Sequence, residues 1–223
     1  MQAPQRRVDQ RRRRTAEERR TLWISVAFAA SGVAAIAIVA ALFFVFGNGS
    51  GNAAPPPVDW SKLVGVQTGP APWNAGLDHL PDRLGPLGLN QLGSEGEKVH
   101  IHQHLDIFVN GKHMTVPALI GIYDDQYLTE LHTHDTSGVM HVESPNKRNF
   151  TLGQFFGVWG VRLDANCIGG YCKPQTPWRM YVNGLNEPGN PADLVLKAHQ
   201  EIVFAIGTKR PKHIPSTYNF GGL

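Results

Sequence analysis

The chain has 223 residues, a formal net charge of +3 at pH 7, and 42% hydrophobic residues. The positive charge is concentrated at the N-terminus, where residues 1–20 hold eight arginines and three acidic residues. The remainder of the chain carries a net charge of −2. The basic balance of the whole chain is therefore no reason to expect nucleic-acid binding, and we exclude nucleic acid as a partner of the folded part.

An uncharged apolar run extends from Leu22 to Phe46, with Ser25 and Ser31 as its only hydroxyl side chains. As a helix it would span roughly 37 Å, enough to cross a hydrocarbon core of about 30 Å. The arginines that precede it place the N-terminus in the cytoplasm. The sequence therefore predicts a cytoplasmic tail at 1–21, a transmembrane helix at 22–46 in contact with the lipid bilayer, and a C-terminal part outside the cytoplasm.

Two other interpretations of this run stay open. A cleaved signal peptide has a shorter apolar region of about 7–15 residues, so a retained anchor fits better. The pair Arg19-Arg20 before the run also fits a twin-arginine export signal.

The segment 47–98 is rich in glycine and proline. Its beginning, GNGSGNAAPPPVDW, is typical of a linker that is flexible and then stiffened by proline. The part at 67–97 has no sustained periodicity, yet it carries Trp73 and several leucines. We expect an ordered but irregular arm here, followed by one domain at 99–223.

The first strands of this domain are predicted from alternation. Apolar and polar residues alternate over 99–109, which is typical of a strand with one buried face. Asn110-Gly111 then predicts a two-residue type I′ turn. The expected pairs across this hairpin are Val109 with Lys112, Ile107 with Met114 and Leu105 with Val116.

A second hairpin is predicted from strands at 128–134 and 139–143 around the turn 135–138. Its four-residue loop pairs His134 with Val139 and His132 with His141. The remaining predicted elements are a helix at 151–159 with Thr151 as its N-cap, a strand at 178–182 and a last strand at 201–206.

This order of elements resembles the β-grasp fold of ubiquitin and the small sulfur-carrier proteins. The residues that carry the likeness are MYVNGL at 180–185 and LVLKAHQEIVFAIG at 194–207. The resemblance implies an α+β fold class: an N-terminal transmembrane helix followed by one β-rich, β-grasp-like extracytoplasmic domain, with the His-rich hairpin at 128–143 as an insertion. The chain is also similar to uncharacterised bacterial single-pass membrane proteins with HxHxH and HTHD segments, which implies no activity.

Cys167 and Cys172 are the only cysteines, in the sequence CIGGYC. Outside the cytoplasm a close pair most often forms a disulfide, and the two glycines permit a tight loop. Ligation of a metal by the two thiolates is the alternative.

Six of the ten histidines fall in two clusters, HIHQH at 100–104 and LHTHDTSGVMH at 131–141. Period-two spacing puts the histidines of each strand on one face. Neutral imidazoles projecting side by side are good ligands for copper or zinc, and neighbouring carboxylates can ligate or orient them. The predicted metal-site residues are His132, His134, His141, His102, His104, Glu130 and Glu143.

The sequence thus favours a membrane-tethered, extracytoplasmic protein that binds copper or zinc on a β-hairpin. One alternative is a metalloenzyme, in which three histidines and a carboxylate leave a coordination position open. Another is a non-catalytic interaction module that docks on a membrane protein complex through a sheet edge. The histidines would then cluster by chance, or cover a polar sheet face.

Overall fold

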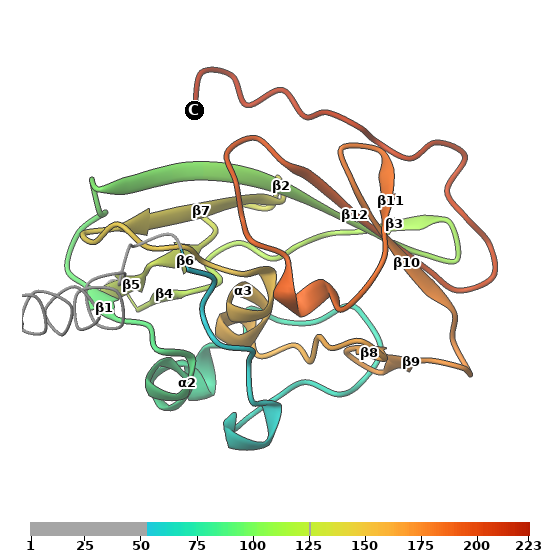
Figure 1. Cartoon of the computed structure of the whole chain (residues 1–223). Helices are drawn as coiled ribbons and strands as arrows, with labels where there is room; N and C mark the ends of the chain where they lie inside the picture. The colour runs from blue at the N-terminus through green and yellow to red at the C-terminus, as the bar shows by residue number, and fades with distance from the viewer. Residues whose placement is uncertain (1–52, 125) are drawn as a thin grey trace, which may run out of the picture. The chain divides into compact units, whose positions relative to one another are not determined.

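β2 (Val99–Val109) lies in the middle of the main sheet, paired along both edges. The structure is a computed structural model that describes residues 53–124 and 126–223. Within these residues the strand order is β11-β10-β12-β2-β7-β6, with β3 also paired to β2. The bounds of the partners are β3 Lys112–Met114, β6 Leu131–His132, β7 Val139–Ser144, β10 Trp178–Val182, β11 Leu185–Glu187 and β12 Glu201–Ile206 (Figure 1).

β12 pairs with β2 in parallel, and the other ladders of this sheet are antiparallel. The parallel register places Glu201 opposite His104 and Phe204 opposite Ile107. The predicted strands at 178–182 and 201–206 are confirmed as β10 and β12.

The first hairpin is shorter than predicted. Val109 pairs with Lys112 and Ile107 with Met114, as expected. The predicted pair of Leu105 with Val116 is wrong, because the backbone N–H of Leu105 donates to Gly138 O at 3.0 Å. The second hairpin therefore occupies this part of the β2 edge, and β7 pairs with β2 from Val99 to His104.

α3 (Leu152–Trp159) covers the apolar face of the sheet (Figure 1). Thr151 is its N-cap, as predicted, and forms a capping box with Gln154. Phe156 contacts Phe204 of β12 at 5.8 Å between ring centroids. The alternation of the strands thus directs one face of the sheet into the core that α3 completes.

The arm also contributes to this core. It contains the 3₁₀ helices η1 (Trp60–Lys62) and η2 (Leu77–His79) and the helix α2 (Leu80–Leu87), which the sequence did not predict. Trp73, Leu80 and Leu84 are buried against the same core as α3. The remaining elements are β1 Gln91–Leu92, β4 Ile122–Tyr123 and β5 Tyr127–Thr129 in a small sheet, and η3 Pro191–Asp193.

Arg83 of α2 is completely buried and caps the C-terminus of α3. Its guanidinium donates to Gly157 O and Val158 O, both at 2.9 Å, and also to Gly76 O. These carbonyls include groups that the last turn of a helix leaves unpaired, at its negative end. Arg83 therefore connects the arm to α3 through backbone groups.

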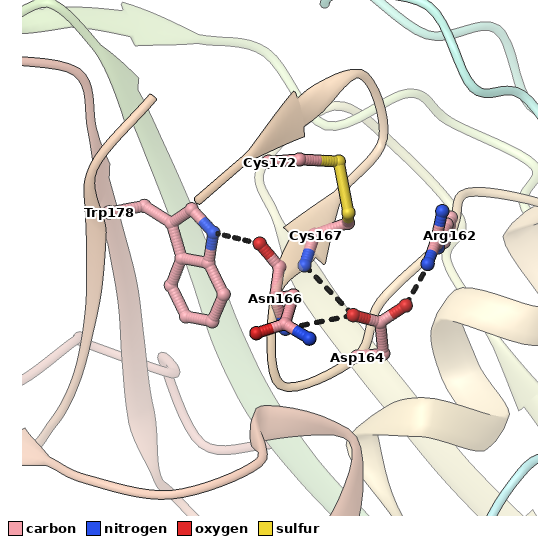
Figure 2. The surroundings of a disulfide bond; sticks show 6 residues. All are labelled: Arg162, Asp164, Asn166, Cys167, Cys172 and Trp178. Atoms are coloured by element: carbon pink, nitrogen blue, oxygen red, sulfur yellow. Dashed lines mark hydrogen bonds and ion pairs between the residues drawn. A yellow bond between two sulfur atoms is a disulfide. The ribbon is translucent and has the colours of Figure 1, made fainter. Parts of the chain in front are cut away.

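The predicted disulfide is confirmed between Cys167 and Cys172. The cysteines lie opposite each other in the small hairpin of β8 (Cys167–Ile168) and β9 (Tyr171–Cys172). Figure 2 shows that the Asp164 carboxylate accepts from the backbone N–H groups of Asn166 and Cys167, at 2.8 and 2.9 Å. Burial opposes ionisation of Asp164, but these bonds and Arg162 lower its pKa below the ordinary value.

The predicted fold class, α+β with an N-terminal transmembrane helix, is corrected by this structure. The described residues form mainly β-sheet, with only two short α-helices of eight residues each. Across 53–124 and 126–223 there is no helix both long and apolar enough for a membrane crossing. The predicted helix at 22–46 and the tail at 1–21 lie outside the described residues.

Replacing Arg83 with Met should lower the free energy of unfolding by about 3 kcal/mol, because several buried carbonyls would lose their donor. Denaturant unfolding of the full chain measures this. The control is Arg179→Met on the exposed face of β10, which should change the value by less than about 0.5 kcal/mol. Equal stability of the two variants would contradict the capping role.

Replacing both cysteines with Ser should lower the free energy of unfolding by about 2 kcal/mol, because the unfolded chain would no longer be constrained by the crosslink. The loop is short, so the value lies at the low end of the usual range for disulfides. Unfolding with and without reductant checks this. Before reduction, thiol labelling of the denatured wild type should find no free cysteine. Stoichiometric labelling there would count against the disulfide.

Candidate metal centre

Three histidines form a row across neighbouring strands. The β-ladders place His102 of β2 opposite His141 of β7, and His141 opposite His132 of β6. The predicted pair of His132 with His141 is thereby confirmed. The ring centroids of His141 and His102 lie 4.5 Å apart, and those of His141 and His132 lie 5.2 Å apart. The row lies on the face opposite α3, since Leu131, Met140 and Val142 point into the core.

His134 joins the row from the loop that follows β6. Its Nε2 lies 3.2 Å from Nε2 of His132, and its ring lies 4.5 Å from that of His141. The next residue, Asp135, accepts from the backbone N–H of Ser137 at 2.8 Å and closes the turn. The side chain of His134 thus lies beside the imidazoles of His132 and His141.

Glu143 is the carboxylate of the cluster and is almost fully buried. Its Oε1 lies 3.2 Å from Nδ1 of His141, 3.4 Å from Nε2 of His100 and 4.0 Å from Nε2 of His132. Burial opposes its ionisation, but the hydrogen bond with His141 and the neighbouring imidazoles lower the pKa of Glu143 below its ordinary value. The cluster therefore combines several potential nitrogen ligands with one buried carboxylate.

A backbone contact fixes the tautomer of His132. Its Nδ1 lies 2.9 Å from Thr129 O, a group that can only accept. Nδ1 must therefore carry the proton, which leaves a lone pair on Nε2 for a metal. Burial lowers the pKa of His132 to about 4, so the ring is neutral at pH 7.

The spacing of the ligand atoms suits one small ion. One potential ligand atom from each of His132, His134, His141 and Glu143 lies within 4.8 Å of all the others. At metal–nitrogen distances of about 2.0–2.1 Å, two tetrahedral ligands lie roughly 3.3 Å apart. The 3.2 Å between the Nε2 atoms of His132 and His134 matches that separation.

A second group overlaps the first and consists of His100, His102, His141 and Glu143. His102 is 5% exposed, and its Nε2 has no hydrogen-bond partner among the described residues. Burial and the neighbouring His141 lower the pKa of His102 to about 4. Oε2 of Glu143 is likewise buried and lacks a partner within 53–124 and 126–223.

His104, the third histidine of β2, belongs to a different cluster. Its Nδ1 lies 2.8 Å from the Glu201 carboxylate, and its Nε2 lies 2.8 Å from Ser137 O. Burial opposes the charge on the ring, but the bonds to Glu201 and Ser137 raise the pKa of His104 above its ordinary value. Although His104, Asp106 and Glu201 are close enough to hold an ion, both ring nitrogens of His104 are engaged as they stand.

Glu130 also lies apart from the row. Its carboxylate pairs with Arg148 and accepts from Ser144 Oγ at 2.8 Å and from the backbone N–H of Asn90 at 3.1 Å. The ion pair with Arg148 balances the charge of the carboxylate, and each of its oxygens accepts a hydrogen bond. The sequence analysis placed Glu130 among the metal-site residues, whereas in the structure its carboxylate contacts Arg148 and Ser144.

The C-terminal segment 207–223 crosses the same face of the sheet as the histidines (Figure 1). Tyr218 stacks on the ring of His104 at 3.8 Å between centroids. A cavity of about 190 Å³ lies between this segment and the site, with His134, His141, Tyr218 and Phe220 among its lining residues. An ion or small molecule can reach the histidines from this side.

The sequence-predicted site is thus divided by the structure. His132, His134, His141 and Glu143 lie together, His102 joins them through His141, and His104 and Glu130 have other partners. The prediction omitted His100, although the period-two pattern of HIHQH put it on the same face. It also omitted Thr129 and Glu201, because contacts through a backbone carbonyl or a parallel strand leave no local signal.

No match to this chain was found among protein-family models, curated proteins or solved structures.

Proposed function

We propose that this protein binds a transition metal ion, copper or zinc, through His132, His134, His141 and Glu143. The observation that carries the proposal is the convergence of the His132 and His134 Nε2 atoms at 3.2 Å beside a buried carboxylate. Imidazole is a good ligand for both zinc and copper, and an arrangement of three nitrogens and one oxygen accommodates either ion.

The burial of the site supports a resident ligand over a purely structural role. A buried carboxylate needs a compensating positive charge. Among the described residues, the ion-pair partners of Glu143 are His100, His132 and His141. A metal cation would supply that charge without requiring any of these histidines to be protonated.

A location outside the cytoplasm is part of the proposal and is supported by the disulfide, since such bonds persist mainly in oxidising compartments.

Replacing His132, His134 or His141 with Ala should each weaken the tightest metal site by more than about 100-fold. A residue that only orients a ligand typically changes affinity by roughly 10–100-fold, so a direct ligand should exceed that range. The measurement is competitive titration of the purified full chain with Zn²⁺ and with copper, and elemental analysis of the natively purified protein identifies the metal.

The matched control is His213→Ala, an exposed histidine outside the cluster, which should bind as the wild type does. Circular dichroism checks that each variant is folded, and His132→Gln serves where the Ala variant is not. Wild-type affinity in all three folded ligand variants would overturn the proposal.

A further inference from the structure

We propose that the same cluster holds a second metal ion, on His100 and His102, with Glu143 shared between the two ions. This inference rests on the proposed function and extends it from one ion to two. The second group has ligand atoms mutually within 4.8 Å, as the first has, and the two groups have His141 and Glu143 in common.

The first argument is the unpartnered nitrogen of His102. The side chain is almost fully buried, yet its Nε2 has no hydrogen-bond partner in the described part of the chain. Burying a polar atom without a partner is unfavourable by about 1–3 kcal/mol. A metal at this position would supply the missing interaction, whereas the ion held by His132 and His134 is on the far side of His141 in the row.

The second argument is the carboxylate of Glu143. Its Oε1 faces His141, His100 and His132, while Oε2 is buried without a partner among residues 53–124 and 126–223. Oε1 thus faces a histidine of each position, His132 of the first and His100 of the second, and Oε2 is left for a further interaction. A carboxylate shared in this way would hold two ions about 3.5–4 Å apart, the usual separation in two-metal sites.

The third argument is the continuity of the ring contacts. The centroids of His100 and His102 lie 5.0 Å apart, and those of His102 and His141 lie 4.5 Å apart. With His100 at one end and His134 at the other, the ring contacts extend beyond the row of His102, His141 and His132. The side chain of His100 is 46% exposed and that of His134 is 43% exposed. Both ends are open to solvent, so each ion has its own route to the cluster.

The two positions differ in preorganisation. The tautomer of His132 is fixed by Thr129 O, whereas no comparable contact to His102 exists among residues 53–124 and 126–223. The second ion also binds against the repulsion of the first, because Glu143 is the carboxylate that both ligand groups share and Glu95, 3.6 Å from Nε2 of His134, lies beside the first position. The position on His132 and His134 should therefore fill first, and the position on His100 and His102 more weakly.

Titration of the full chain with Zn²⁺ alone tests this by counting equivalents. The wild type and His213→Ala should bind two equivalents, the second more weakly. His100→Ala and His102→Ala should each bind one equivalent with the affinity of the first position unchanged. Because His100 is exposed, its variant should fold even if His102→Ala does not.

Copper loading tests whether the two positions are adjacent. With Cu²⁺ alone, the electron paramagnetic resonance signal per copper should fall when the second equivalent is added, since two ions bridged by Glu143 couple magnetically. Glu143→Gln should remove that coupling. An undiminished signal at two equivalents would place the second ion elsewhere and overturn the inference.

The outcomes separate this inference from the proposed function. One equivalent of Zn²⁺ in the wild type, lost in His132→Ala, would reject the second ion and leave the first site standing. Two equivalents in His100→Ala and in folded His102→Ala would also reject the second ion as assigned. No binding by the wild type would reject both proposals.

Discussion

The structure depends on the pairing of β2 along both of its edges. A strand held by β12 on one edge and by β3 and β7 on the other cannot rotate or slip without moving every side chain to the opposite face. One face of β2 therefore completes the core with Leu105 and Ile107, and the other presents a line of histidines. The histidines on the strands are therefore as rigid as the sheet, whereas His134 is positioned by the loop that follows β6.

This arrangement explains how the site can be both buried and polar. The strands carry the imidazoles at fixed spacing, so no loop has to be ordered to bring His102, His141 and His132 together. A metal ion would then bind a site whose ligands lose little conformational freedom. The neighbouring His104 differs from these histidines, because both of its ring nitrogens already have protein partners, Glu201 and Ser137.

The sequence predicted what depends on short-range pattern. Period-two alternation was enough to pair His132 with His141, and Thr151 marked the start of α3. The predicted strand at 128–134 was too long, because β6 ends at His132 and His134 lies in the loop instead of pairing with Val139. The extent of the first hairpin was not predictable in this way, because the backbone N–H of Leu105 donates to Gly138 O of another hairpin. Glu130 was misplaced for a similar reason, since its partner Arg148 lies outside the hairpin pattern. The resemblance to the β-grasp fold remains a prediction.

The parallel ladder between β2 and β12 has a consequence for how the protein is made. Its paired residues His104 and Glu201 are 97 positions apart. Contacts of such long range form late, since a large loop must close before they can stabilise anything. During synthesis one edge of β2 therefore stays unpaired until residues 201–206 have left the ribosome. An exposed strand edge can pair with other chains, so the nascent protein passes through a stage in which it is vulnerable to aggregation.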